Sequence, residues 1–236
     1  MAPSQTWRLP TLVANLPELR QSRIETLLVR GCDALSLSLS GEQLQQLQHY
    51  LALLAHWNKT YNLTAVREEE EMVTRHLLDS LSIASFVDGR RVLDVGTGPG
   101  LPGIPLAILF PGRAVHLLDS NGKKTRFLFQ VKTALGLDNI SIHQARVEAF
   151  TVAERFDTVV SRAFASVADT LNRCRHTLAP GAVLLAMKGV YPADELSAVC
   201  GPDVSIAVHA VVVPGLDEQR HLVEIRPRFA ADRQQP

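Results

Sequence analysis

Apolar residues recur at three- and four-residue steps in the first third of the chain. This spacing places side chains on one face of an α-helix, and the residues that keep it are Leu44, Leu47, Leu51, Leu54 and Trp57. Ser40 stands where an N-cap residue is expected, and Gln43, three residues later, completes the pattern of a capping box. The sequence therefore predicts a helix that begins directly after Ser40.

A second helix is predicted to open with the acidic run at 68–71. Carboxylates in a first turn are stabilised by the positive end of the helix dipole, so we interpret the run as a solvated helix start. The apolar residues that then face one way are Val73, Leu77, Leu81 and Ala84. Earlier in the chain the pattern is weaker: residues 11–37 are only weakly helical, and residues 1–10 are expected to be frayed.

From residue 90 onward the period changes to short, nearly continuous apolar runs, which are typical of strands buried on both faces. The runs lie at 91–96, 114–120, 140–145, 156–163 and 182–189. Helical stretches at 101–110, 122–136 and 167–178 separate them, and this alternation predicts βαβ units with a parallel sheet. Two further strands, at 204–213 and 221–226, have no helix between them and are expected to pair antiparallel.

The order of elements predicts an α/β, Rossmann-like protein with a mostly parallel seven-stranded sheet, an antiparallel C-terminal pair and a helical N-terminal region. We expect an N-terminal extension over 1–38 that is partly disordered or weakly helical. A helical cap over 39–88 follows, then the sheet domain over 89–229 and a tail over 230–236.

Composition narrows the class of protein. With 46% hydrophobic and 20% charged residues, the chain has enough apolar area to fold, which excludes disorder as its main state. Lys and Arg together number 24, as do Asp and Glu, so a site for a polyanion must be a local cluster. The three cysteines are widely spaced and form no CxxC, which favours a reduced compartment. We expect a cytoplasmic monomer without a signal peptide, membrane span or metal site.

The most informative stretch is LDVGTGPGLPG at 93–103, where a strand ends at Asp94 and a tight turn leads into a helix. Gly96, Gly98 and Gly100 suit a turn that needs positive φ and close approach to a ligand. Taken alone, the spacing of Gly98, Gly100 and Gly103 also fits the GxGxxG pattern of dinucleotide-binding proteins. A glycine turn with a purely structural role stays possible as well.

Three details favour S-adenosylmethionine over NAD. Asp94 precedes the loop on the strand, where it could order the loop or face a cationic sulfonium. Pro102 and Pro105 remove backbone donors that a pyrophosphate would use. The chain also supplies only one such glycine unit, whereas a dinucleotide fold has two mononucleotide halves.

Further candidates follow the next two strands. Asp119 ends the second strand, where a carboxylate can accept both ribose hydroxyls, although a helix N-cap is the alternative role. Val147 and Glu148 follow the third strand, where an adenine would lie. Val147 could pack on the ring, while Glu148 could be either a hydrogen-bonding partner or an ordinary surface residue.

The fourth strand ends in SRAFA at 161–165, without the Asn/Asp-Pro-Pro-Tyr motif of enzymes that methylate exocyclic amines. No cysteine follows a proline as a nucleophile would. Arg162 at this edge can bind phosphate or donate hydrogen bonds to O6 and N7 of guanine. Phe164 is either a surface on which a base stacks or a core residue. Other cations converge on the same edge, although scattered solvated charges are the alternative: Lys123, Lys124, Arg126, Arg146 and Lys188.

Seven motifs together resemble the RsmG family, also called glucose-inhibited division protein B, over about residues 40–226. They are HWNKTYNLTAVR (56–67), RHLLDS (75–80), LDVGTGPGLPGIPLA (93–107), LLDSNGKKTRFL (117–128), RVE (146–148), SRAFA (161–165) and MKG (187–189). Members of that family are bacterial class I methyltransferases that modify N7 of a guanosine in 16S ribosomal RNA. The resemblance implies S-adenosylmethionine as cofactor and 16S rRNA or the small ribosomal subunit as partner.

The resemblance also implies roles for particular residues. Cofactor contacts are expected from Gly96, Leu101, Val147, Glu148 and Arg162, and Asp119 occupies the position of the ribose-side acid. The segments 57–62 and 76–79 resemble the family's helical cap, in which Asn62, His76 and Asp79 are candidates to meet cofactor or RNA. Because guanine N7 carries a lone pair and no proton, we expect in-line methyl transfer without a general base, with Arg162 as a positioning residue.

Three other functions compete with this hypothesis. They are an NAD-linked oxidoreductase that uses the same glycines, an RNA-binding module without catalysis, and a methyltransferase of another RNA or of a small molecule. Binding of S-adenosylmethionine, or its failure, separates the first two from a methyltransferase.

Overall fold

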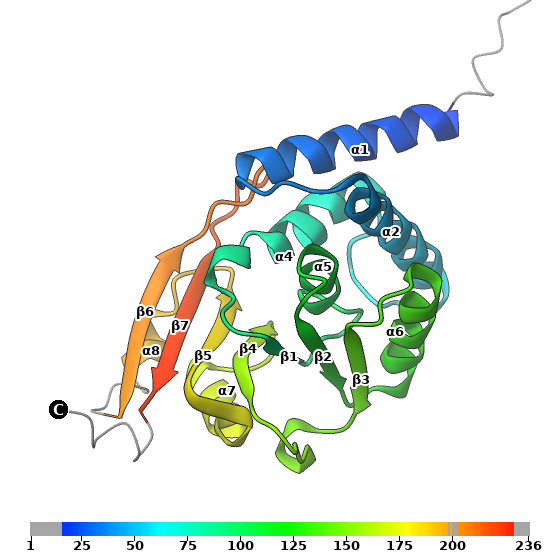
Figure 1. Ribbon diagram of the computed structural model, residues 1–236. Coiled ribbons are helices and arrows are strands. Elements are labelled where there is room, and N and C mark those ends of the chain that lie inside the picture. The colour runs from blue at the N-terminus through cyan, green and yellow to red at the C-terminus, as the bar shows by residue number, and fades with distance from the viewer. Residues whose placement is uncertain (1–15, 198, 200–202, 229–236) are drawn as a thin grey trace, which may run out of the picture.

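The computed structural model describes residues 16–197, 199 and 203–228. The predictions for residues 1–15 and for the tail 230–236 lie outside this range, as does Cys200. A seven-stranded sheet in the order β3-β2-β1-β4-β5-β7-β6 forms the centre of the molecule (Figure 1). Its strands are β1 (Arg91–Val95), β2 (Ala114–Asp119), β3 (Ile140–Gln144), β4 (Phe156–Arg162), β5 (Leu178–Lys188), β6 (Val204–Ala210) and β7 (His221–Pro227).

Strands β1 to β5 pair in parallel, and β7 is antiparallel to both of its neighbours. The C-terminal pair extends from Val204 opposite Pro227 to Ala210 opposite His221. The predicted mostly parallel sheet with an antiparallel C-terminal pair is thereby confirmed. This topology differs from the dinucleotide-binding fold, in which six parallel strands follow the order 3-2-1-4-5-6.

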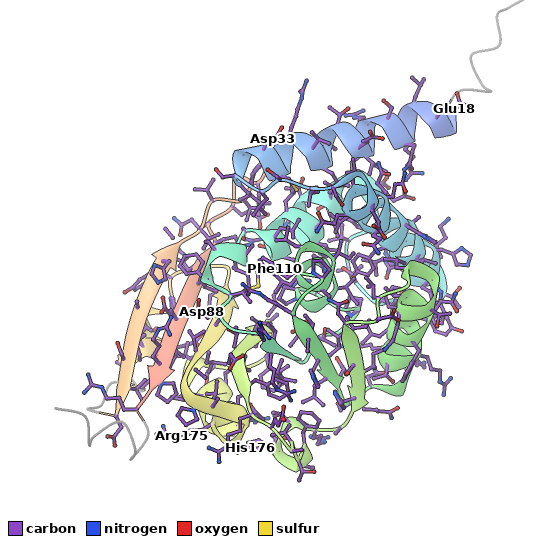
Figure 2. All side chains as sticks on the ribbon, in the orientation of Figure 1. Glu18, Asp33, Asp88, Phe110, Arg175 and His176 are labelled. Carbon is purple, nitrogen blue, oxygen red and sulfur yellow. The ribbon has the colours of Figure 1, made fainter. Side chains whose placement is uncertain are left out.

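Helices cover both faces of the sheet. Figure 1 shows α5 (Gly103–Leu109) and α6 (Gly122–Leu135) on one side and α7 (Val167–Cys174) on the other. Val92 belongs to the apolar cluster beneath α5 and α6, while the next residue, Leu93, belongs to the cluster on the α7 side. Because successive strand residues point to opposite faces, both faces are buried, as the continuous apolar runs indicated. Side chains fill the space between the sheet and its helices (Figure 2).

Four predicted boundaries in the sheet domain shift by two residues or more. The helix predicted at 101–110 begins at Gly103, because Leu101 and Pro102 belong to the preceding turn. Helix α7 ends at Cys174 and is followed by the 3₁₀ turn Arg175–Thr177, so β5 starts at Leu178 rather than 182. Strand β6 ends at Ala210 rather than 213.

The first strong helix is α2 (Gly41–Tyr61), and its predicted capping box is confirmed. The Ser40 hydroxyl accepts a hydrogen bond from the Gln43 backbone N–H, and the Gln43 side chain accepts one from the Ser40 N–H. The same Gln43 side chain donates to the carbonyls of Ile108 and Leu109. These carbonyls lie at the end of α5, so the start of α2 also satisfies acceptors that α5 leaves free.

The second predicted helix is not one regular α-helix. It comprises α3 (Glu69–Met72), a π-helical turn (Val73–Leu78), α4 (Asp79–Leu81) and a 3₁₀ turn (Ala84–Phe86). A π turn adds a residue per turn and rotates the side chains that follow it. His76 and Asp79 are buried together with the predicted apolar residues, as is Met72 before the turn.

The acidic run opens a helix as predicted, with Glu69, Glu70 and Glu71 in the first turn of α3, but these carboxylates are also paired with arginines. Glu69 lies 3.2 Å from Arg20, Glu70 lies 3.0 Å from Arg23, and Glu71 lies 2.6 Å from Arg75. Arg20 and Arg23 belong to α1 (Leu16–Ala34), a 19-residue helix within the weakly patterned segment. Figure 2 labels Glu18 and Asp33 at the two ends of this helix.

Packing, rather than ion pairs, is expected to fix α1 on the rest of the protein. Leu28 is fully buried, so Leu28→Ala should lower the free energy of unfolding by about 2–5 kcal/mol. The Arg20 side chain is half exposed, and Arg20→Ala should cost less than about 1 kcal/mol. Urea unfolding of both variants measures the difference, and equal losses would contradict it.

No helix in the described part of the chain is both long and apolar enough to cross a membrane.

Candidate functional site

The glycine loop is held from inside by Asp94, which is fully buried at the end of β1. Its Oδ2 accepts hydrogen bonds from the Thr97 hydroxyl at 2.6 Å and from the Gly103 N–H at 2.7 Å. Burial raises the pKa of Asp94 to about 6 despite these bonds. Of the two roles considered for Asp94, the geometry supports ordering of the loop.

Asp119, at the end of β2, joins the loop to the start of α6. Its Oδ2 accepts from the Gly98 N–H at 2.9 Å, its Oδ1 accepts from the Asn121 N–H at 2.8 Å, and Lys124 Nζ lies 3.5 Å from Oδ2. Asn121, not Asp119, is the N-cap of α6. Because each carboxylate oxygen has two lone pairs, both oxygens can accept a further hydroxyl.

Helix α2 also contacts the glycine loop. Tyr50 is fully buried on this helix and donates its hydroxyl to the Pro99 carbonyl at 2.9 Å. Burial raises the pKa of Tyr50, so the phenol keeps its proton. Sequence reasoning missed this residue, although a tyrosine within the apolar face between Leu47 and Leu51 was a signal.

A cavity of about 270 Å³, here called the small cavity, opens where β1, β2, β3 and β4 end. Its lining includes Gly96, Asp119, Lys124, Arg146, Val147, Glu148, Ala163 and Phe164. Sequence reasoning proposed all of these except Ala163, and the fold brings them together from four separate strand ends.

The residues of the small cavity fit the adenosine part of S-adenosylmethionine. Gly96 is the loop glycine that lines the cavity, with φ +68°, while Gly98 is buried and donates its N–H to Asp119. Asp119 offers acceptors for a ribose diol, and Val147 supplies a buried apolar surface for a ring. The volume lies below the ~300–1,000 Å³ usual for whole ligands, so the rest of the cofactor must extend beyond it.

A second cavity of about 470 Å³, the large cavity, adjoins the small one, and Ala163 lines both. Ala163 has φ +50°, an unusual conformation for a residue with a Cβ. Walls come from the helical cap, from the ends of β4 and β5, and from the segment before β7. The residues that line it include Thr64, Val66, His76, Asp79, Ile83, Arg162, Met187, Lys188, Val211, Arg220 and His221.

Asp79 is the electrostatic centre of the large cavity. It is 3% exposed and pairs with two guanidinium groups, Arg162 through Oδ2 and Arg220 through Oδ1, each at 3.1 Å. Arg162 also donates to the Arg75 carbonyl at 3.1 Å. Arg162 thus lines the large cavity and not the small one, so a cofactor contact from it must involve the end of the ligand that passes Ala163.

His76 lies beside this cluster and is 5% exposed. Its Nε2 is 2.8 Å from the Thr64 hydroxyl, and its buried Nδ1 has no partner among the described residues. Burial, followed by the charge of Arg162, lowers the pKa of His76 to about 4. The ring is therefore neutral at pH 7.

The lowered pKa of His76 should appear in the acid stability of the protein. Between pH 6.5 and 4 the unfolded chain binds a proton that the folded chain does not, so stability falls as the pH falls. The shift corresponds to about 3 kcal/mol, and His76→Gln, which can keep the Thr64 hydrogen bond, should remove most of this loss. Urea unfolding at pH 7 and pH 4 tests this, with exposed His49→Gln as the control that should follow the wild-type profile.

Lys188 and Asn62 have surroundings other than those expected, while Phe164 packs against the core cluster, one of its two predicted roles. Lys188 donates to the Ala165 carbonyl and to both oxygens of Glu195, which leaves its ammonium no spare proton for RNA. Phe164 packs on Gly96, where an added Cβ would lie 2.7 Å from its ring. Asn62 lines neither cavity, and its side chain accepts from Arg67 at 2.8 Å.

The other cations surround the small cavity. Lys124 and Arg146 line it, and Lys123 and Arg126 are exposed on the first turn of α6. Glu148 is also exposed and pairs with Arg173 at 3.0 Å, while Leu101 is buried beneath the loop. Sequence reasoning missed Arg220 and His221, because nothing in the predicted loop and strand signalled that Arg220 contacts Asp79 or that His221 lines the same cavity.

Comparison with known proteins agrees with this geometry. The chain matches the family described as rRNA small subunit methyltransferase G over residues 43–223. A relative from Nitrosococcus oceani named "Ribosomal RNA small subunit methyltransferase G" is 49% identical over 208 residues, which cover 88% of this chain and 97% of that protein. One of the same name from Pseudomonas fluorescens is 54% identical over 196 residues, covering 83% and 92%.

Solved structures support the fold at much lower identity. A ribosomal protein L11 methylase from Lactobacillus delbrueckii subsp. bulgaricus has TM-score 0.51 and 18% identity, covering 64% of this chain and 77% of that one. The P. horikoshii TYW2 in complex with MeSAdo has TM-score 0.51 and 12% identity, covering 64% and 62%. With half or more of the chain matched by one family and close relatives matched over nearly their whole length, this chain belongs to the rRNA small subunit methyltransferase G family.

Proposed function

We propose that the protein is a monomeric cytoplasmic enzyme that transfers a methyl group from S-adenosylmethionine to N7 of a guanosine in 16S ribosomal RNA. The observation that carries the proposal is the pair of cavities that meet at Ala163, one suited to an adenosine and one open to an acceptor. The names of the relatives, which specify small-subunit rRNA, supply the substrate class.

The cofactor brings the transferable methyl on a sulfonium. Gly96, Gly98, Gly100 and Leu101 would shape the loop around it, ordered by Asp94. Asp119 would accept the ribose hydroxyls, and Val147 and Glu148 would flank the adenine. Arg162 would contact the other end of the cofactor: among the described residues its Nε and Nη2 have no partner.

The acceptor chemistry requires positioning rather than proton removal, because guanine N7 has an in-plane lone pair and no proton. The groups near the large cavity suit this requirement. His76 is neutral, and Asp79 is committed to two arginines. The thiols of Cys32 and Cys174 are buried with pKa values raised to about 11 and 12 by burial, so neither is a nucleophile.

The RNA backbone would lie over the start of α6. Lys123, Lys124 and Arg126 place three positive charges in the first five residues of α6, where they oppose the helix dipole. Arg146 adds a fourth at the small cavity, which Lys124 also lines. A polyanion offsets that repulsion. Phe164, His76 and Asn62 stay candidates for contact with RNA or with the cofactor, whereas Lys188 is committed to holding the 163–166 segment against α8 (Ala193–Ser197).

Transfer of labelled methyl to small ribosomal subunits from cells that lack this gene tests the proposal. We expect label in 16S RNA as 7-methylguanosine, identified by mass spectrometry of the digested nucleosides. Tight binding of S-adenosylmethionine without transfer would keep the cofactor assignment and contradict the acceptor.

Arg162→Ala should reduce methyl transfer at least about 100-fold, because the guanidinium is held against Asp79 at the junction of the two cavities. Arg175→Ala, an arginine distant from both cavities, is the control. Full activity of Arg162→Ala with unchanged affinities for cofactor and RNA would contradict the positioning role.

A further inference from the structure

Arg220 is a cation of the large cavity to which sequence reasoning gave no role. It lies directly before β7, and its side chain is 19% exposed. Nε donates to Asp79 at 3.1 Å, Nη1 to the Gln219 carbonyl at 2.8 Å, and Nη2 to Glu218 at 3.2 Å. Three contacts fix the orientation of the guanidinium before any ligand binds, which lowers the entropy cost of recognition.

The Arg220 guanidinium has N–H groups that these three hydrogen bonds do not use. Arginine carries five N–H groups, and the three bonds leave one N–H on Nη1 and one on Nη2. Glu218 is tied in turn to Arg75, so the segment that carries Arg220 is anchored to the π-helical turn of the cap. A fixed donor pair beside the apolar wall of Val66, Ile83 and Val211 is the combination that a nucleobase requires.

The chemistry of the acceptor selects which base atom Arg220 can bind. Guanine presents N7 and O6 on its major-groove edge, whereas adenine presents N7 and an N6 amino donor. N7 must stay free of donors, because its lone pair attacks the methyl group. Recognition along this edge therefore has to use O6, which accepts a hydrogen bond where adenine would offer a donor.

We propose that Arg220, held in place by Asp79, donates to O6 of the acceptor and is the residue that distinguishes guanine from adenine. The inference rests on the proposed function and deepens it. Arg162, on the other oxygen of Asp79, serves the cofactor end, so one buried carboxylate positions a guanidinium for each of the two substrates.

The test uses small subunits reconstituted with transcribed 16S RNA in which the methylated nucleotide is either guanosine or adenosine. For Arg220→Ala we expect kcat/KM on the guanosine subunit to fall about 10- to 100-fold, with little change on the adenosine subunit. The guanine-to-adenine ratio should fall by the same factor, and Arg220→Lys should recover part of it. The Kd for S-adenosylmethionine should stay within twofold of wild type.

Arg226→Ala is the matched control. Arg226 lies on β7, the strand that Arg220 precedes, also pairs with two carboxylates, Glu224 and Asp88, and lines neither cavity. An unchanged guanine-to-adenine ratio in Arg220→Ala would overturn the inference. A lower salt dependence of RNA binding, by about one counterion, would overturn it too, because it would assign Arg220 to a phosphate. Absence of methyl transfer by the wild type would instead refute the proposed function.

Discussion

Replacement of Asp119 by alanine is expected to weaken binding of S-adenosylmethionine by about 100-fold or more. The carboxylate would accept two ribose hydroxyls, and hydrogen bonds to a charged group contribute about 1.5–3 kcal/mol each. Two such bonds correspond to at least about 3 kcal/mol, or a factor above 100 in Kd. The variant also releases the Gly98 and Asn121 N–H groups, so the loop loses part of its order.

Isothermal titration with S-adenosylmethionine measures this effect. Asp119→Asn keeps one acceptor oxygen and should lie between the wild type and the alanine variant. Asp138→Ala removes an exposed carboxylate beyond the end of α6 and should leave Kd unchanged. If Asp119→Ala bound the cofactor within threefold of wild type, the ribose role would be wrong and only loop ordering would be left to Asp119.

Reversal of two charges at the start of α6, Lys123→Glu with Arg126→Glu, is expected to lower RNA affinity by about 100-fold at 0.1 M salt. Each phosphate contact adds about 0.7–0.9 to the slope of log affinity against log salt. Two lost contacts cost roughly 25- to 60-fold at that concentration, and repulsion by the new carboxylates increases the loss. Both residues are exposed and line neither cavity, so cofactor binding should not change.

Filter binding of small subunits over a range of salt concentrations measures affinity and slope together. Arg90→Glu with Arg155→Glu makes the same change in charge at residues that precede β1 and β4, on the opposite edge of the sheet. This control should bind RNA nearly as well as wild type. Equal losses in the two double variants would mean that net charge, and not the α6 surface, governs binding.

Much of the cofactor half of the site could be predicted from the sequence. Gly96, Asp119 and Val147 each follow a strand, and parallel strands bring their carboxyl ends to one edge. That regularity is enough to place them around one cavity. Asp94 was ambiguous, because a sequence does not show whether a carboxylate turns inward to the Thr97 hydroxyl and Gly103 N–H or outward to a ligand.

The residues of the large cavity, where we propose that the acceptor binds, were harder to predict from the sequence. Asp79 and Arg220 are 141 residues apart, and the contact between them depends on how the cap lies against the C-terminal strand pair. The π-helical turn at Val73–Leu78 changes which cap residues face inward, and no regular helical period anticipates such a turn. Lys188 lies at the predicted edge of the sheet, but its ammonium donates its hydrogen bonds to Glu195 and to the Ala165 carbonyl.

The sequence by itself determined the α/β class, the antiparallel C-terminal pair, the capping box at Ser40 and the glycine loop with Asp119 at the end of the next strand. These features depend on local spacing and on the fixed geometry of parallel strands. Only the tertiary structure decided that the acidic run pairs with α1, that Arg162 lies in the large cavity, and that Asp79 joins it to Arg220. The physical reason is that charge pairing depends on the distances between side chains. These distances are set by the packing of segments that are remote in the sequence, and the local pattern of residues does not reveal them.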